Sequence, residues 1–336
     1  MLPPTPYPVQ VHSYLPIPST AIHQPPASAV QVYEHLPAYP FTSPSTSSSQ
    51  QTSPPQNALV FIGGLGDGPH TIPYVRALAQ HLSSSTSSYS VFEARLSSAF
   101  SAFGYASLAQ DAREIAGLVR YLRQGLGRRR VVLMGHSTGC QDCLEYGSKF
   151  LKLGASDLRG EGEGEEVVRV DGLVLQGPVS DREAIAMAED EGAVRACLAV
   201  AEGMVKEGKG AEVMRREEMP AGWRGSPVTA YRWCSLAGVG GDDDYFSSDL
   251  PDEKVADIWG KLEQPVLILP SEKDEWVPKK IDVVGLVKRW KSFCKPGIVS
   301  GLSGLIPGAN HRVEDAAAQE WLAERVAGFL AEIERE

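Results

Sequence analysis

The feature that most constrains the fold of this chain is a short apolar run that ends in a glycine-flanked serine. Residues 131–134 (Val-Val-Leu-Met) lead directly into Gly-His-Ser-Thr-Gly at 135–139. This pattern is typical of a buried parallel strand that turns sharply into a helix, with the serine hydroxyl exposed at the turn. The flanking glycines let strand and helix approach closely, and the helix N-terminus favours negative charge beside the serine. Ser137 is therefore the candidate nucleophile.

Because a five-residue motif with two glycines also occurs by chance, its context decides its meaning. Three arginines at 128–130 precede the apolar run. After the serine, small and apolar residues recur at helical spacing, at Cys140, Cys143, Leu144, Gly147 and Leu151. This periodicity predicts the helix that the motif requires. A turn with no chemistry is the alternative, and only a suitably placed base and acid elsewhere in the chain exclude it.

Strand-like and helical segments alternate along most of the chain. Apolar runs predict strands at 58–62, 89–96, 131–134, 173–176, 266–269 and 298–306. Helical periodicity predicts one helix that begins near residue 71 and another near residue 107, and further helices at 182–206, through residue 290 and at 316–333. This alternation predicts the α/β class, with a mostly parallel, doubly wound sheet.

The length of 336 residues and the hydrophobic content of 43% suit one large α/β domain that carries an insertion. Between 178 and 263 the alternation of strand and helix breaks down, which predicts a cap. The predicted organisation is an N-terminal edge hairpin at 1–40, a Ser/Pro-rich loop at 41–56, core at 57–177, the cap at 178–263, and core again at 264–336. An acidic, Gly-rich stretch at 156–166 is expected to be a solvated loop insertion.

A serine nucleophile of this kind requires an acid and then a histidine later in the chain, on loops that follow later strands. Only one of the 7 histidines, His311, lies beyond the serine, and it follows the last predicted strand. Asp274 follows the strand at 266–269, with Glu272 and Glu275 beside it. We expect an Asp274 carboxylate oxygen within about 3.2 Å of one His311 ring nitrogen. A histidine on a surface loop is the alternative for His311.

The glycine-rich loop at 63–68 follows the strand at 58–62. Such a loop can present a backbone N–H to an oxyanion, together with the N–H of the residue after the nucleophile. The predicted oxyanion donors are therefore Leu65 and Thr138. A dinucleotide-binding loop is the alternative, but the sequence Gly-Gly-Leu-Gly-Asp-Gly lacks the Gly-x-Gly-x-x-Gly spacing.

Charge and cysteine content exclude several other classes. The net charge of -10 disfavours nucleic acid and anionic membranes as partners, because phosphate contacts need clustered Lys and Arg. Cys140 and Cys143 form a Cys-x-x-Cys pair, but no second pair completes a zinc site, so we expect reduced core thiols. The run at 242–244 (Asp-Asp-Asp) is expected to be a solvated or cap-anchoring loop. The sequence predicts no metal and no cofactor.

The first residues contain neither a basic nor an apolar leader region, and no run reaches the ~18 apolar residues of a membrane span. A cytoplasmic location is the resulting expectation. The expected partner is a small-molecule ester, with no nucleic acid, no membrane and no obligate protein partner.

Four segments carry a resemblance to a known family: 61–68 (FIGGLGDG), 135–142 (GHSTGCQD), 242–250 (DDDYFSSDL) and 308–311 (GANH). Together they resemble the fungal α/β-hydrolase family that includes the fusarinine-type siderophore esterases, from about residue 59 to the C-terminal helix. The resemblance implies an α/β-hydrolase fold and a serine esterase that cleaves ester bonds of hydroxamate siderophores inside the cell, which frees iron. The Ser-rich and Glu-rich insertions depart from the family pattern and leave the substrate open.

Other functions remain compatible with the residues. The alternatives are a carboxylesterase or thioesterase for unrelated small esters, an acyltransferase with the same triad, and a non-catalytic binding protein of the same fold. The presence of Ser137, Asp274 and His311 argues against the binding protein. Aromatic residues of the predicted cap either enclose a bulky ligand or simply pack the cap; they are Trp223, Tyr231, Trp233, Tyr245 and Phe246.

Overall fold

The computed structural model describes residues 7–17, 29–36, 55–84, 87–152 and 169–335. Most of the predicted loop at 41–56 and all of the acidic insertion at 156–166 lie outside these residues. The strands are β1 (Val9–Tyr14), β2 (Val30–His35), β3 (Asn57–Ile62), β4 (Tyr89–Arg95), β5 (Val131–His136), β6 (Gly172–Gln176) and β7 (Val266–Leu269).

The helices are α1 (Pro73–Ser84), α2 (Leu108–Arg120), α3 (Gly139–Leu144), α4 (Asp181–Ala188), α5 (Glu191–Lys206), α6 (Ala230–Ala237), α7 (Asp252–Trp259), α8 (Val283–Phe293) and α9 (Ala316–Arg335). Single π-helical turns extend α2 and α3, at Tyr121–Gly125 and Glu145–Lys149. None of the helices in the described ranges is long and apolar enough to span a membrane.

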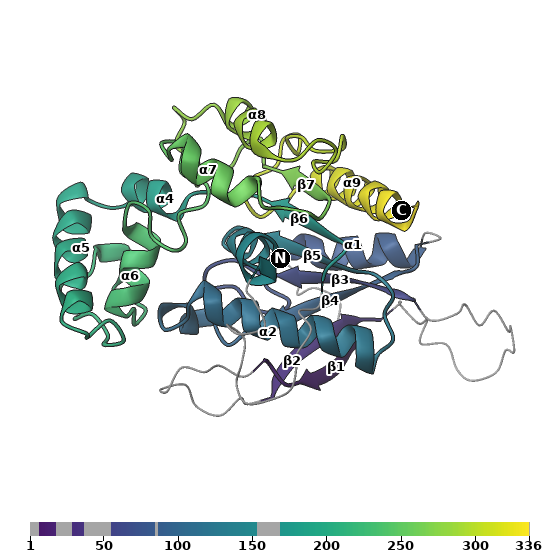
Figure 1. The fold of residues 1–336 in the computed structure, drawn as a ribbon, viewed down its shortest axis with the longest axis horizontal. Coiled ribbons are helices and arrows are strands. Elements are labelled where there is room, and N and C mark those ends of the chain that lie inside the picture. Colours follow the sequence, from purple (N-terminus) through teal and green to yellow (C-terminus); the bar gives the residue numbers. More distant parts are fainter. Residues whose placement is uncertain (1–6, 18–28, 37–54, 85–86, 153–168, 336) are drawn as a thin grey trace, which may run out of the picture.

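The strands form one sheet in the order β1-β2-β4-β3-β5-β6-β7. The pairs from β4 through β7 are parallel, whereas β1 pairs antiparallel with β2, and β2 antiparallel with β4. Every residue of β3, β5, β6 and β7 is buried, as expected for strands that helices cover on both faces. The mostly parallel sheet is the one that the sequence predicts, and its antiparallel hairpin lies at one edge (Figure 1).

Helices cover both faces of this sheet. Buried side chains of α1 and α9 pack on one face, together with Leu59, Val132 and Val174. Side chains of α2, α3, α7 and α8 pack on the other face. Because β3 to β7 run parallel, their carboxyl ends lie along one common edge of the sheet. The loops that leave this edge hold the predicted site residues.

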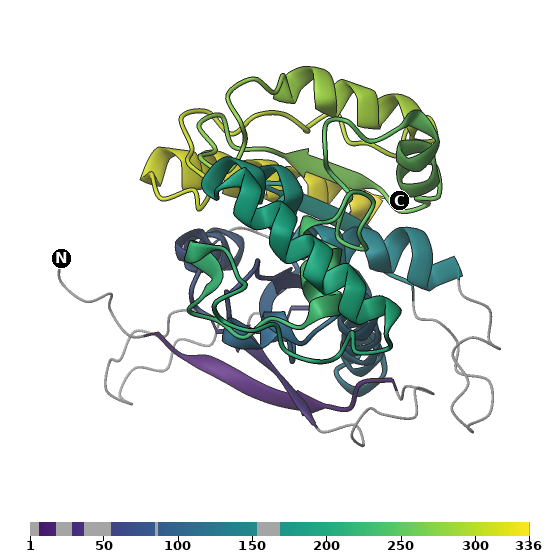
Figure 2. The same ribbon diagram turned by 90° about the vertical axis from the view of Figure 1, so that its left-hand side faces the viewer.

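Helices α4, α5 and α6 form a separate layer beside the sheet, which we call the cap layer (Figure 1). Seen from the side, this layer lies in front of the sheet (Figure 2). It has its own small apolar core, which includes Ile185, Cys197, Met214 and Trp233. The later part of the predicted cap behaves differently, because side chains of residues 245–262 pack in the sheet core. The domain boundaries at 178 and 263 stay predictions.

The single helix predicted at 182–206 is wrong, because the structure contains two helices, α4 and α5. Glu189 ends α4 in an extended conformation, with φ -119° and ψ 162°. The Asp190 carboxylate then accepts a hydrogen bond from the Ala193 N–H at 2.9 Å and caps α5. An aspartate that can cap a new helix competes with continuation of the old one, which explains the break.

The strand predicted at 298–306 is also wrong. The segment runs beside β7 but pairs only at two isolated bridges, Val266 with Val299 and Ser271 with Ile306. Between them the chain turns, with the Ser303 N–H donating to the Ser300 carbonyl at 3.2 Å. The serine and glycine residues of 300–304 favour this turn over a continuous ladder, because serine side chains bond to nearby backbone.

Candidate active site

Ser137 lies between β5 and α3, at the sharp turn that the sequence predicts. Its φ is 53°, in the left-handed region that a serine rarely adopts. A Cβ on Gly135 would lie 2.2 Å from the Gly139 carbonyl oxygen, and one on Gly139 would lie 2.3 Å from the Ile62 carbonyl oxygen. Both positions therefore require glycine, and the strained turn holds the serine at the edge of the sheet.

The loops after β7 and before α9 bring Asp274 and His311 together. The Asp274 Oδ2 lies 2.8 Å from His311 Nδ1, and the two side chains are only 4% and 6% exposed. The expected contact between this acid and this histidine is thus present. In the described part of the chain no hydrogen bond joins Ser137 Oγ to His311, whose Nδ1 bonds to Asp274. In many enzymes the hydrogen bond between nucleophile and base forms or shortens only when substrate binds.

The two glutamates beside Asp274 accept hydrogen bonds from the backbone of the loop that carries His311. Glu275 Oε2 accepts the His311 N–H at 2.8 Å, and Glu272 Oε2 accepts the Gly308 N–H at 2.6 Å. The Lys273 N–H also donates to the Ala309 carbonyl at 2.8 Å. One acidic loop therefore fixes both the ring and the main chain of His311. Sequence reasoning placed these glutamates beside the acid but did not foresee this contact.

A buried polar network supports the other side of His311. The His136 ring lies 4.8 Å from the His311 ring, centroid to centroid. His136 Nδ1 donates to Gln176 Oε1 at 2.6 Å, which also accepts from the Tyr74 hydroxyl at 2.9 Å. Gln176 Nε2 donates to the His311 carbonyl at 3.3 Å.

Burial, followed by the nearby His311, lowers the pKa of His136 to about 3. His136 therefore stays neutral beside His311, which allows the His311 ring to take up a proton without facing a second imidazolium. Sequence reasoning missed Gln176 and Tyr74. The signal that could have indicated Gln176 is a single polar residue at the end of an otherwise apolar strand.

Leu65, one of the two predicted oxyanion donors, lies on the loop between β3 and α1, and Thr138, the other, directly follows Ser137. Among the described residues, neither of their backbone N–H groups donates to a protein acceptor. The neighbouring Gly64 N–H, in contrast, donates to Asp67 Oδ2 at 3.1 Å. The Ser137 N–H is also engaged, with the Gln176 carbonyl at 3.0 Å. The two predicted donors are thus available for a substrate oxygen.

Ser137 and His311 line a cavity of about 570 Å³ between the sheet edge and the cap layer. Its apolar wall includes Phe103, Ile185 and Trp223. Its volume falls within the ~300–1,000 Å³ of typical small-molecule sites.

Of the five aromatic residues in the predicted cap, only Trp223 lines this cavity. The ring of Trp233 packs against Trp223 at 5.0 Å inside the cap layer. Tyr245 and Phe246 are 1% exposed and belong to the sheet core. Most of the aromatic cluster therefore packs the protein and does not enclose a ligand.

The aspartate run at 242–244 anchors the cap. Asp243 forms a buried ion pair with Arg232 of α6 at 2.5 Å. Further carboxyls surround this guanidinium, and burial raises the pKa of Asp111 to about 8 and the pKa of Asp142 and Asp181 well above the usual range. Because Asp111 lies on α2 and Asp142 on α3, this cluster joins the cap layer to the core.

Comparison with known proteins agrees with this architecture. The chain is 32% identical to the esterase AN6793 of Emericella nidulans, over 83% of this chain and 87% of the relative. It is 30% identical to the fusarinine C esterase sidJ of Aspergillus fumigatus, over 82% and 89%. The solved structure of the siderophore hydrolase EstB of Aspergillus fumigatus superposes with a TM-score of 0.72 at 26% identity, over 98% of this chain and 99% of that one.

The α/β-hydrolase fold expected from the sequence is confirmed by this superposition and by the parallel sheet with helices on both faces. Esterase relatives along most of the chain place the protein among carboxylic ester hydrolases. A family model described as protein of unknown function (DUF1749) matches residues 21–331, and the chain therefore belongs to this family.

Proposed function

We propose that this protein is a serine hydrolase that cleaves ester bonds of fusarinine-type hydroxamate siderophores through an acyl-enzyme, and so releases iron inside the cell. The observation that carries the serine mechanism is the 2.8 Å contact between Asp274 Oδ2 and His311 Nδ1, with His311 and Ser137 lining one cavity. The substrate class rests on the two relatives named for fusarinine C and siderophore hydrolysis.

In this mechanism Ser137 Oγ attacks the ester carbonyl carbon, while His311 Nε2 accepts the hydroxyl proton. The Leu65 and Thr138 N–H groups stabilise the oxyanion of the tetrahedral intermediate. The carbon–oxygen bond then breaks, and the leaving alcohol takes the proton from Nε2. A water molecule repeats the sequence on the acyl-enzyme and releases the carboxylic acid. Asp274 holds the ring so that Nδ1 keeps its proton and Nε2 faces the serine.

The alternatives differ in what reaches the acyl-enzyme and in which ester enters the cavity. A carboxylesterase or thioesterase would prefer unrelated small esters, and an acyltransferase would pass the acyl group to an alcohol or amine in place of water. A non-catalytic binding protein would form no acyl-enzyme at all. The available oxyanion donors and the buried acid–histidine pair favour catalysis over binding.

Two assays separate these functions. First, a fluorophosphonate probe should label the native protein but not the Ser137→Ala variant, and an unlabelled native protein would exclude a serine enzyme. Second, a panel of esters with ferric and iron-free fusarinine-type siderophores, p-nitrophenyl acetate and an acyl thioester should give the highest kcat/KM for the siderophores. A higher kcat/KM for another ester would refute the substrate class while leaving the serine mechanism intact.

A further inference from the structure

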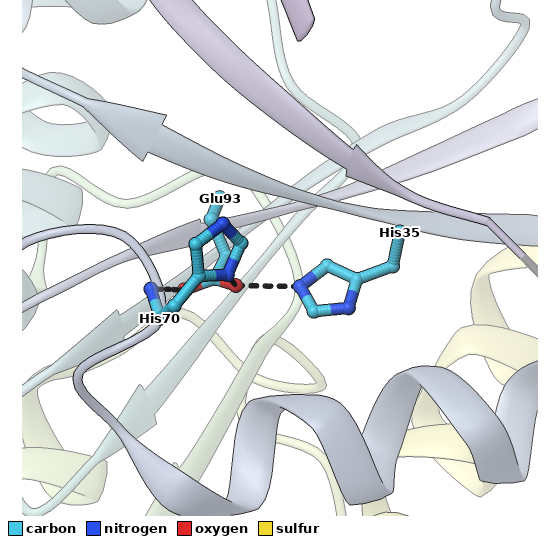
Figure 3. Close-up of side chains that lie close together, drawn as sticks. All are labelled: His35, His70 and Glu93. Carbon is cyan, nitrogen blue, oxygen red and sulfur yellow. Dashed lines mark hydrogen bonds and ion pairs between the residues drawn. The ribbon is translucent and has the colours of Figure 1, made fainter. Parts of the chain in front are cut away.

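A group of two histidines and one glutamate lies outside the proposed active site, near the antiparallel edge of the sheet. His35 is the last residue of β2, Glu93 lies on the neighbouring β4, and His70 lies on the loop between β3 and α1. Figure 3 shows their side chains pointing toward one another. No sequence motif indicates this group, because the three residues come from separate segments.

Both imidazoles approach the same carboxylate oxygen. His35 Nε2 lies 2.5 Å and His70 Nδ1 lies 2.8 Å from Glu93 Oε1. One ligand atom from each residue lies within 4.8 Å of the other two. In tetrahedral coordination, ligand atoms about 2.0–2.2 Å from a zinc ion lie roughly 3.3–3.6 Å apart. The two contacts to Glu93 Oε1 would widen to this separation and the imidazole nitrogens would close to it, so side-chain shifts of about 1 Å would let all three residues coordinate one ion.

The second oxygen of Glu93 fixes the position of the carboxylate. Glu93 Oε2 accepts the His70 backbone N–H at 2.7 Å. His70 itself has a φ of 67°, a conformation that a histidine adopts only when its surroundings hold it there. These contacts orient the carboxylate and one imidazole in advance, as outer hydrogen bonds do in metal sites.

We propose that His35, His70 and Glu93 bind a divalent first-row transition-metal ion, of which zinc is the representative. Imidazole nitrogen with carboxylate oxygen is a donor set that suits zinc and its neighbours in the series. The side chains of His35 and Glu93 are each 1% exposed, whereas that of His70 is 33% exposed. The ion would therefore enter on the His70 side, where water can complete its coordination.

A structural ion pair is the competing explanation. The single negative charge of Glu93 is neutralised by one imidazolium, so an ion pair accounts for only one of the two histidines that contact it. His35 Nδ1 is buried and has no partner among the described residues. This does not separate the two explanations, because Nδ1 carries a proton both in an imidazolium and in an imidazole that binds a metal through Nε2. The two explanations differ in whether the purified protein takes up metal at these residues.

The test uses the full chain after removal of metal with a chelator. Zinc is titrated against a chromogenic indicator, with the native protein and the His70→Asn variant side by side. Asparagine tolerates the positive φ and keeps the backbone contact with Glu93, so this variant should fold. His81→Gln, which removes a histidine from α1, is the matched control. We expect one zinc per native chain, the same in the control, and at least about 100-fold weaker binding in His70→Asn.

X-ray absorption at the zinc edge gives a second readout that does not depend on any variant. We expect nitrogen and oxygen ligands at about 2.0–2.1 Å with scattering from two imidazoles. Sulfur at about 2.3 Å would place the ion at cysteines and overturn the proposal. Lack of saturable binding, or equal binding by the His70→Asn variant, would likewise leave only an ion pair. The proposal does not depend on the proposed esterase function, and neither measurement uses activity.

Discussion

The substitution Asp274→Asn tests the proposed catalytic centre most directly. Asp274 Oδ2 accepts from His311 Nδ1 at 2.8 Å, and this carboxylate is 4% exposed, so water cannot replace it easily. An asparagine can turn its NH₂ toward Nδ1, which forces the ring proton onto Nε2. The nitrogen that faces the serine would then be a donor and could not accept the hydroxyl proton. Comparable changes in serine hydrolases lower kcat by about 10⁴, which corresponds to ~5.5 kcal/mol in the barrier.

Glu275→Gln is the matched control for this substitution. The Glu275 carboxylate accepts the His311 backbone N–H, and the glutamine amide oxygen can accept the same bond. We therefore expect Glu275→Gln to lower kcat by less than about 10-fold, since one neutral hydrogen bond contributes ~1 kcal/mol.

The assay is steady-state hydrolysis of p-nitrophenyl acetate at several pH values, with circular dichroism to check the fold. If Asp274→Asn kept more than about a tenth of the native kcat, or if both variants lost the same activity, Asp274 would not be the residue that orients the base.

Three further predictions concern other parts of the site. In the native protein His136 should make the unfolding free energy fall by ~1.4 kcal/mol per pH unit between about pH 6.5 and 4, because its folded ring, with its pKa lowered to about 3, stays neutral there while the unfolded ring takes up a proton. His136→Asn should remove this contribution and make the fall less steep. An unchanged slope in acid-range urea titrations would contradict this. Gly64→Ala should lower kcat/KM at least about 10-fold, because the new Cβ would lie 2.6 Å from the Ser137 Cβ, and wild-type kinetics would refute the crowding argument. Arg232→Met should lower the unfolding free energy in urea by about 3–5 kcal/mol, because it leaves the buried Asp243 carboxylate without its ion-pair partner. Arg195→Met, at a pair whose side chains are 74% and 88% exposed, should change the unfolding free energy by less than ~0.5 kcal/mol.

The sequence alone determined the elements on which the fold rests. Apolar runs located β3 to β7 to within two residues at each end, because strands buried on both faces tolerate few polar side chains. The order of serine, acid and histidine along the chain selected Ser137, Asp274 and His311, and the structure brings the last two into contact. The same local patterns failed at 182–206 and 298–306, where an aspartate cap and a bond from the Leu302 N–H to the Ser300 hydroxyl interrupted an otherwise suitable periodicity.

Only the tertiary structure decided what surrounds these residues. The glutamates that hold the His311 loop, the Gln176 network behind His136, and the carboxyls around Arg232 all join segments far apart in the chain. The group of His35, His70 and Glu93 is assembled in the same way. Periodicity in a sequence reports which side chains are buried, because burial repeats with the helix or strand. It does not report which buried polar groups meet, since that depends on the order of the strands in the sheet and on the paths of the loops between them.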